Sequence, residues 1–346
     1  MTAARLLGVE YLTPDELETC RSRRWRDVLG LALFSSANTP LDACDVPIAH
    51  IRAPPLGASS ALCEVWRGEG PLTTGRIGLV DYRASRSLVF GCVTLREDPP
   101  ASAGQDGEAL REIATRAYAE VFRCMTTLGF PRAIRIWNYL PEINRAAGGI
   151  ERYRLFNEAR QRAFRTFDRA VRGDVPAACA LGSPAGGALV VYFLAGTEQI
   201  TAIENPRQVA AYDYPSQYGA FSPTFSRATL AAAGGPALLV SGTGSIVGHR
   251  TMHAGDVVAQ TRETIANIRA LIAEANRVAG AELFVPERLK YKVYVRRPDD
   301  LAAVAAEFSA SVHAATPVVF INAEICREDL LVEMEAVGCG AEPVRQ

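Results

Sequence analysis

The same order of elements occurs twice in this chain, about 150 residues apart, and this repetition restricts the fold more than any other feature. In each copy a helix ends at a glycine, a strand follows, a proline ends the strand, and a second helix begins. The helices are predicted from apolar side chains at helical spacing, and Gly129 and Gly280 suit left-handed helix ends. The first copy has a helix over 108–128, a strand over 133–139 and a helix over 150–171; the second has a helix over 261–278, a strand over 289–295 and a helix over 299–314.

We interpret this order as an internal structural duplication, with two unrelated α/β units as the alternative. In either case the fold class is α/β (α+β), and each half should be a sheet with helices packed on one face. The stretch 172–184 is rich in Gly, Pro and Ala and marks the predicted boundary. It gives an N-terminal half of residues 1–175 and a C-terminal half of residues 176–346, with the active site between or beside them.

Further strands are predicted outside the repeated order. Runs with β-branched or aromatic residues lie at 61–67, 76–81 and 87–95 in the first hundred residues, and at 318–322 and 330–334 near the end.

Composition excludes several classes of protein. The 346 residues carry 37 basic and 38 acidic side chains, so no basic excess indicates nucleic-acid binding. No apolar run approaches the roughly 18 residues that span a membrane, and the start lacks the apolar stretch of a secretory signal, so we expect a cytoplasmic protein. The eight cysteines form no CxxC pair and the four histidines form no zinc-type helical pair, so no metal site is predicted.

The helix over 150–171 carries an unusual polar stripe. Tyr153, Asn157, Arg160 and Phe164 share one side at helical spacing. Such a stripe can point into a cleft, where the planar guanidinium of an arginine can hold a carboxylate by two hydrogen bonds. A solvated helix face rich in arginine is the alternative.

Two later segments have features of binding loops. The segment 205–228 holds three tyrosines, three prolines and two arginines with little periodicity, which fits either a site lining or a surface loop held by its tyrosines. The segment 240–248 reads VSGTGSIVG, and its glycines allow a close backbone approach, although a strand bulge explains them equally.

The tail 320–337 contains the strongest candidate for acid catalysis. In a strand over 330–334, Leu331 and Glu333 face one side and Leu330, Val332 and Met334 the other. A carboxyl group among apolar neighbours tends to hold its proton, as a general acid must. An exposed glutamate at the end of a strand, and a packed rather than reactive Cys326, are the alternatives.

These segments together resemble the chorismatase family. The resemblance rests on WNYLPEIN at 137–144, ERYRLFNEAR at 151–160, the block at 205–228, SGTGSIVGH at 241–249 and AEICREDLLVEME at 323–335. It covers the chain from about residue 60 to the end. It implies a fold similar to Rid-type and AroH-type chorismate mutase units, and it implies chorismate as the small-molecule substrate and pyruvate as one product.

The resemblance also implies roles for individual residues. Glu333 matches the family's acid, and Tyr153, Arg160, Tyr214 and Arg227 are the candidates for binding the substrate carboxylates. Aromatising members have Gly in the SGT-x-S motif and Cys in the tail, as Gly244 and Cys326 do here, so the expected product is 3-hydroxybenzoate, with 4-hydroxybenzoate open as a second product.

Other functions remain as alternatives. They are a chorismate hydrolase that gives a dihydroxycyclohexadiene carboxylate, a non-catalytic Rid-type protein that binds a small acid, and a Rid-type imine hydrolase. The expected chemistry requires no metal or organic cofactor, and the expected assembly is a monomer or a trimer-like homo-oligomer.

Overall fold

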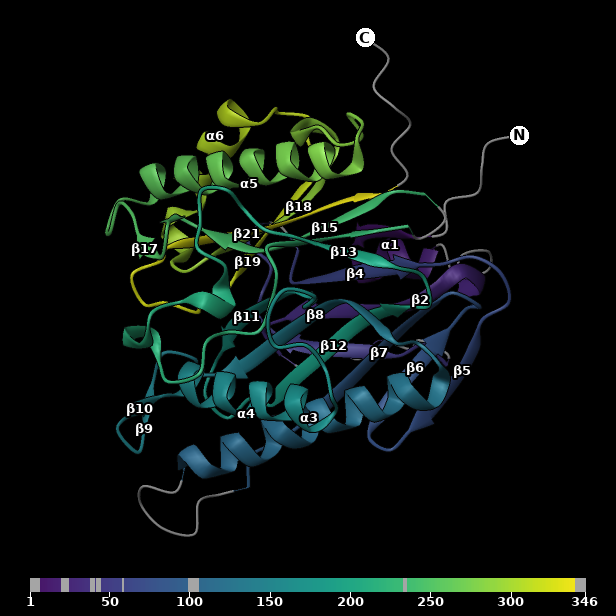
Figure 1. Cartoon of the computed structure of the whole chain (residues 1–346). Helices are drawn as coiled ribbons and strands as arrows, with labels where there is room; N and C mark the ends of the chain where they lie inside the picture. The colour runs from purple at the N-terminus through teal and green to yellow at the C-terminus, as the bar shows by residue number, and fades with distance from the viewer. Residues whose placement is uncertain are drawn as a thin grey trace, which may run out of the picture.

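Two helix-covered sheets and a third, smaller sheet surround the centre of the molecule (Figure 1). This computed structural model describes residues 7–19, 25–37, 41, 45–57, 59–98, 106–232 and 235–339. Cys20 and Cys44, two of the eight cysteines, lie outside this part of the chain.

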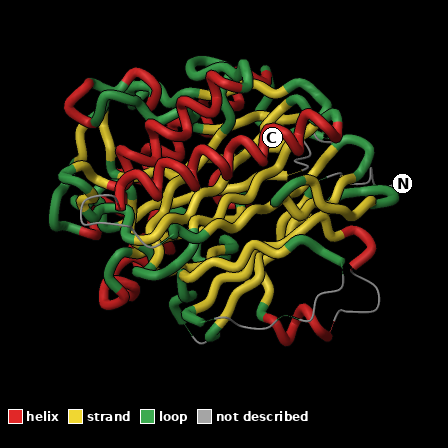
Figure 2. Tube along the Cα trace, turned by 90° about the horizontal axis from the view of Figure 1, so that it is seen from below, coloured by secondary structure: helices red, strands yellow, loops and turns green. Residues whose placement is uncertain are grey.

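The first large sheet has seven strands in the order β20-β11-β8-β12-β7-β6-β5. Helices α3 (Asp106–Leu128) and α4 (Arg152–Thr166) cover its outer face and lie side by side across its strands (Figures 1 and 2). Apolar side chains of both helices, among them Val121 and Phe156, pack on Val191 and Phe193 of the sheet. The strands are β5 (Thr73–Ile77), β6 (Val80–Ala84), β7 (Leu88–Leu95), β8 (Arg132–Pro141), β11 (Ala177–Ser183), β12 (Leu189–Gly196) and β20 (Glu324–Ile325).

The second large sheet has six strands in the order β13-β14-β15-β21-β18-β19. Helices α5 (Val257–Ala279) and α6 (Leu301–Ser311) cover its outer face, and their apolar residues pack on Val332, Met334 and Ala336. The strands are β13 (Ile200–Ile203), β14 (Ala228–Ala231), β15 (Ala237–Gly244), β18 (Lys290–Val295), β19 (Val318–Asn322) and β21 (Val332–Cys339).

The third sheet has four strands in the order β1-β4-β2-β3. They are β1 (Gly8–Leu12), β2 (Val28–Ser35), β3 (Ile48–Arg52) and β4 (Ala61–Arg67), with α1 (Pro14–Thr19) packed against β4 and β1. The remaining short elements are β9 (Ala146–Ala147), β10 (Ile150–Glu151), β16 (Ile246–Val247), β17 (Arg250–Thr251), η1 (Trp25–Asp27), η2 (Ala211–Asp213), η3 (Ser216–Tyr218), η4 (Pro286–Arg288) and η5 (Pro298–Asp300).

The strand order shows that the repeat is structural. In the first sheet β8 pairs in parallel with β11, and β12 lies between β8 and β7; in the second sheet β18 pairs in parallel with β19, and β21 lies between β18 and β15. The small sheet repeats this inner order, because β2 pairs in parallel with β3, and β4 lies between β2 and β1. Three units of one topology therefore surround a common centre.

The expected fold class is confirmed, since each large sheet carries helices on one face. The boundary expected after residue 175 does not separate two sheets, because β11 and β12 follow it and still pair with β8 and β7. The third sheet was not predicted as a unit. Within the described residues, no helix is long and apolar enough to cross a membrane.

Most predicted helices and strands agree with the structure within a few residues, and three do not. The run 76–81 is a hairpin, because Gly78 turns the chain with a positive φ between β5 and β6. The last strand begins at Val332 and extends to Cys339, beyond the predicted 330–334. The second helix of the first copy ends at Thr166, so the prediction to 171 was too long.

Candidate active site

Six of the seven predicted site residues line one cavity near the start of β21. They are Tyr153, Tyr214, Arg227, Gly244, Cys326 and Glu333. The residues come from α4, the segment 205–228, β15, the turn after β20, and β21, so elements of both large sheets form the wall. Arg160 is buried but does not line this cavity.

Glu333 enters the cavity because of the alternation along β21. Val332, Met334 and Ala336 face α5, so Glu333 and Glu335 face the centre of the molecule. Glu333 is 3% exposed, and the exposed strand end considered as an alternative is therefore excluded. Its Oε1 atom has no hydrogen-bond partner among the described residues, and Cys326 Sγ lies 3.9 Å from Oε2.

A bulge in β15 makes room for the Glu333 carboxyl group. The pairing of β15 with β21 shifts register between Val240 and Thr243, which leaves Ser241 and Gly242 out of the regular ladder. A Cβ atom on Gly242 would lie 2.0 Å from Glu333 Oε1, so any other residue there would displace the Glu333 carboxyl group. The strand-bulge interpretation of this glycine-rich segment is therefore confirmed, and its glycines Gly242 and Gly244 also line the cavity, while their role in a site stays a prediction.

Gly244 lies directly opposite Glu333 in the ladder. A Cβ atom there would lie 3.0 Å from Leu330 Cδ1 and 3.2 Å from Cδ2. Leu330 also lines the cavity, so an alanine at position 244 requires this side chain to move within the wall. The buried Asn267 of α5 holds the backbone here, because its Nδ2 donates to the carbonyls of Gly244 at 3.0 Å and Ile246 at 2.9 Å.

Guanidinium groups surround the cavity. Arg227 donates from Nη2 to Tyr214 Oη at 2.7 Å and to the carbonyl of Val209, and its Nε has no partner among the described residues. Arg327 lies over the ring of Tyr218, 4.2 Å from the centroid, and its Nη2 is likewise unpaired in the described chain. Buried cationic donors of this kind favour an anionic ligand.

The polar stripe of α4 is buried, which excludes the solvated helix face. Asn157 and Arg160 are 2% and 1% exposed, and Arg160 Nη2 donates to Asn157 Oδ1 at 2.7 Å. Tyr153 lies at the start of the helix and reaches the cavity. Arg160 therefore belongs to a buried layer next to the wall, and its contact with substrate stays a prediction.

Sequence reasoning missed several wall residues. Arg327, Tyr218, Phe225, Gly242 and Leu330 all line the cavity. Each lies within a segment already singled out, but no spacing rule distinguishes a wall residue in an irregular loop from its neighbours. Arg327, directly after Cys326, could have been found as the cation nearest to that candidate.

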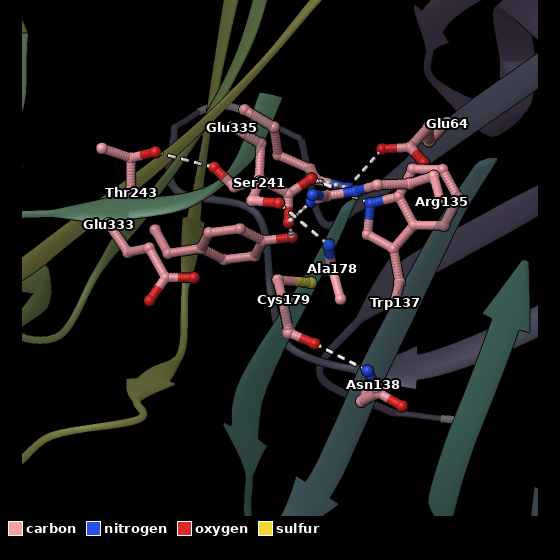
Figure 3. A network of polar contacts seen from close by, with 12 residues as sticks. Glu64, Arg135, Trp137, Asn138, Ala178, Cys179, Ser241, Thr243, Glu333 and Glu335 are labelled. Atoms are coloured by element: carbon pink, nitrogen blue, oxygen red, sulfur yellow. Dashed lines mark hydrogen bonds and ion pairs between the residues drawn. The ribbon is translucent and has the colours of Figure 1, made fainter. Parts of the chain in front are cut away.

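A buried ionic cluster lies behind Glu333 (Figure 3). Glu335 contacts Arg135 Nη2 at 3.1 Å and Lys292 Nζ at 3.3 Å, and it accepts hydrogen bonds from Trp137 Nε1 at 2.9 Å and Tyr294 Oη at 3.2 Å. Lys292 also donates to Glu64 of β4. All four charged side chains of this cluster, Glu64, Arg135, Lys292 and Glu335, are at most 5% exposed.

The two carboxyl groups on β21 have opposite acidities. Burial raises the pKa of Glu333 to about 8, and the negative charge of Glu335 adds to this effect. Burial alone would also raise the pKa of Glu335, but Lys292 and Arg135 outweigh it and lower this pKa to about 2. At neutral pH, Glu333 therefore holds a proton beside an ionised Glu335.

Cys326 is not set up as a nucleophile. Burial, followed by the nearby Glu333 carboxyl group, raises the pKa of its thiol to about 12. The thiol therefore keeps its proton at neutral pH and can act as a weak donor.

A larger cavity, of about 680 Å³, lies near the other end of β21, lined by Val9, Arg67, Phe284 and Cys339 among others. It contains none of the predicted site residues. Within the described ranges, no group of His, Cys, Asp and Glu side chains is arranged to hold a metal ion.

Comparisons with known proteins support one family. The family model "Chorismatase FkbO/Hyg5-like, N-terminal" matches residues 64–195. A 3-hydroxybenzoate synthase of Streptomyces hygroscopicus is 33% identical over 327 residues, which cover 90% of this chain and 92% of the relative. A chorismatase of the same organism is 32% identical over 90% of this chain and 89% of its own. The crystal structure of a chorismatase matches with a TM-score of 0.84 at 30% identity, covering 97% of this chain and 99% of the other.

The raised pKa of Glu333 predicts a pH dependence of stability. The folded protein holds this proton up to about pH 8, whereas the unfolded chain releases it near the ordinary value of about 4.3. Between these values the folded state binds more protons, so the free energy of unfolding falls as pH rises, by up to about 4 kcal/mol from this group. Urea unfolding between about pH 5 and pH 8 should show a steeper decline in the wild type than in Glu333→Gln, which keeps only the share of other buried carboxyl groups such as Glu204.

The control for this comparison is Glu274→Gln on α5, a glutamate whose pKa is lowered by its hydrogen bond to Arg277 and which therefore titrates below this window. It should follow the wild type. Equal slopes for the wild type and Glu333→Gln would show that Glu333 has the same pKa in the folded and unfolded states.

Proposed function

The chain belongs to the chorismatase family, and from this premise we propose that it converts chorismate to 3-hydroxybenzoate and pyruvate, with 4-hydroxybenzoate open as a second product. The observation that carries the proposal is the Glu333 carboxyl group, which is buried in the cavity wall and protonated at neutral pH. A general acid works best when its pKa lies near the working pH.

The first step requires a proton on carbon. Chorismate carries an enolpyruvyl ether on a cyclohexadiene ring, and protonation of the ether's terminal methylene gives an oxocarbenium ion. Glu333 supplies that proton and becomes a carboxylate beside the new cation, which it stabilises. The bond between the ring carbon and the ether oxygen then breaks, and the three-carbon unit leaves as pyruvate. The oxygen of the neighbouring ring hydroxyl bonds to the vacated carbon as its proton returns to Glu333. Opening of this three-membered ring at the other carbon, with loss of the hydrogen from the carbon that keeps the oxygen, directly or after its migration, gives 3-hydroxybenzoate. Direct loss of the hydrogen at the hydroxyl-bearing carbon, without the three-membered ring, gives 4-hydroxybenzoate.

The cations around the cavity fit the charge of the substrate. Chorismate carries two carboxylates, and Arg227 and Arg327 present buried guanidinium N–H donors without partners in the described chain. Arg227 also holds the hydroxyl of Tyr214, so both groups can contact one carboxylate. Tyr153 lines the wall next to Cys326 and Glu333, and Arg160 is its charged neighbour.

Gly244 and Cys326 support the aromatising subtype. Chorismate splits into a hydroxybenzoate and pyruvate without net water, so exclusion of water from the oxocarbenium ion favours this outcome over hydrolysis. Gly244 leaves space for Leu330 in the cavity wall, and the protonated thiol of Cys326 lies 3.9 Å from the acid. Both side chains occupy space in the wall that water would otherwise fill.

Incubation of the purified protein with chorismate, without added metal, tests the function directly. Chromatography should show 3-hydroxybenzoate and an equimolar amount of pyruvate. The dihydroxycyclohexadiene carboxylate in its place would identify a hydrolase of the same family. Binding of chorismate without any turnover would contradict the proposal and favour a protein that binds a small acid.

Glu333→Gln should reduce pyruvate release by at least about 100-fold, because the amide cannot supply the proton. In the wild type, kcat/KM should fall above about pH 8, where Glu333 loses its proton. A thermal melt and a circular dichroism spectrum of the variant serve as controls for folding. Residual activity within about tenfold of the wild type would remove Glu333 as the acid.

Gly244→Ala should change the product rather than abolish the reaction. The added methyl group pushes Leu330 within the wall, so the substrate lies differently over Glu333 and water reaches the oxocarbenium ion. We expect a larger share of the dihydroxycyclohexadiene carboxylate in the chromatogram, with pyruvate release retained. Leu330→Val in the same background restores space beside the methyl group and should shift the product back. An unchanged product in Gly244→Ala would contradict this role for Gly244.

A further inference from the structure

The two carboxyl groups on the inner face of β21 have very different surroundings. Glu335 has two cations and two neutral donors within 3.3 Å. Glu333, two residues earlier on the same face, makes no ion pair among the described residues, and one of its oxygen atoms has no hydrogen-bond partner. Figure 3 shows Glu335 next to Arg135 and Trp137, and Glu333 directed away from them.

The charges of the cluster balance only when Glu335 is included. Lys292 and Arg135 are cations, and Glu64 and Glu335 are anions, so the four side chains sum to zero. Lys292 lies directly opposite Glu335 in the β18–β21 ladder, and Tyr294, next along that face of β18, lies opposite Glu333. Without Glu335, two buried cations would share the single anion Glu64, and Glu333 would be the nearest remaining acid.

Other titratable groups also face this region. Burial and, after it, the charges of both carboxyl groups raise the pKa of the Cys179 thiol on β11. Cys326 contacts Glu333, and Arg296, directly after β18, lowers the pKa of Glu333 less than Arg135 does. The remaining groups that face the pair are the hydroxyls of Tyr11, Tyr139, Tyr153 and Tyr192. Burial, ahead of their charged neighbours, raises the pKa of each of these tyrosines, so none of them ionises near neutral pH. Glu335, Arg135, Lys292 and Arg296 therefore supply the charge on the cluster side of Glu333, and Glu151, Arg154, Arg227 and Arg327 supply it from the other walls of the cavity.

We propose that Glu335 is a positioning residue for the acid: it neutralises Lys292 and Arg135 behind the cavity, so that these cations do not draw the proton from Glu333. Its hydrogen bonds to Trp137 and Tyr294 hold the carboxylate on the cluster side of β21. This role rests on the proposed function for its catalytic consequence, but the protonation it sets is a property of the protein alone.

Two single variants of the cluster test this role, because they should move the pH profile in opposite directions. Glu335→Gln removes a negative charge and keeps the size, so the fall of kcat/KM at high pH should move down by about 1–3 pH units. Lys292→Met removes a positive charge from the same cluster, so the fall should move up. The double variant Lys292→Met with Glu335→Gln restores the balance and should return the profile to near that of the wild type.

A merely structural role gives a different result. Damage to packing would lower activity by one factor at every pH, and the double variant would be worse than either single variant. An unmoved profile in Glu335→Gln, or a shift in the same direction for both single variants, would overturn the proposal. If Glu335→Gln does not fold, Lys292→Met alone tests the proposal, because its fall of kcat/KM should move to higher pH.

Infrared spectroscopy separates this inference from the function. The difference spectrum between the wild type and Glu333→Gln isolates the C=O band of the protonated Glu333, and no substrate is needed. This band should persist to about pH 8 in the wild type and disappear at lower pH in Glu335→Gln. Loss of the band near pH 4 in the wild type would overturn the proposal, whereas a normal band without pyruvate release would overturn the proposed function only.

Discussion

The ion pairs of Lys292 are the interaction on which the rest of this structure depends. Its ammonium group contacts Glu64 of the four-stranded sheet and Glu335 of the six-stranded sheet, while Arg135 of the seven-stranded sheet contacts Glu335 in turn. Removal of one partner from such a buried pair leaves an uncompensated charge and costs about 3–5 kcal/mol. Aromatic rings surround the cluster, with Trp137 stacked on Tyr192 at 4.6 Å and Lys292 5.7 Å from the Trp137 ring. These ion pairs therefore join all three sheets at their common centre.

The ionic cluster and the cavity are adjacent along the inner face of β21, because Glu335 belongs to the first and Glu333 to the second. Alternation along β21 sends Glu333 and Glu335 to the same side, and the neighbours decide their charges. Lys292 and Arg135 keep Glu335 ionised, whereas Glu333 lies beside Gly242 of the β15 bulge and opposite Gly244, without an ion pair among the described residues. Two carboxyl groups that are two residues apart on one face of a strand thus have opposite protonation states at neutral pH. In pairs of this kind, different surroundings separate an acid that holds its proton from a carboxylate with a fixed charge.

The sequence predicted the local parts of this arrangement and missed the parts that depend on distant residues. The repeated helices, the strand β8 and the inward Glu333 follow from periodicity and from a tail motif within one segment. Strand β2 is a continuous apolar run without alternation, a pattern that buried helices and buried strands share, so the third sheet was not predicted. Strand β12 of the seven-stranded sheet was missed for the same reason. Glu335 was visible in the tail, but its partners Arg135 and Lys292 come from other elements, and no spacing rule joins residues so far apart. The boundary after residue 175 failed for the same reason, because the parallel pairing of β11 with β8 is not local.

The repeated topology also explains why the molecule has one such acid. Strands β4, β12 and β21 occupy the same place in the three units, and each sends a polar residue to the centre, namely Glu64, Tyr192 and Glu335, with Tyr192 Oη donating to Glu64 at 3.0 Å. Two residues earlier on each strand stand Leu62, Val190 and Glu333, and the first two are buried in the apolar core between the sheets. The fold therefore offers three equivalent inward positions next to a polar centre, and only the third carries a carboxyl group. In that unit alone, β15 has the bulge at Ser241 and Gly242 that leaves space for the acid, whereas its counterpart β7 pairs with β12 without a shift in register. A carboxyl group at this inward position and a bulge in the neighbouring strand thus distinguish the unit that carries the candidate acid from the other two.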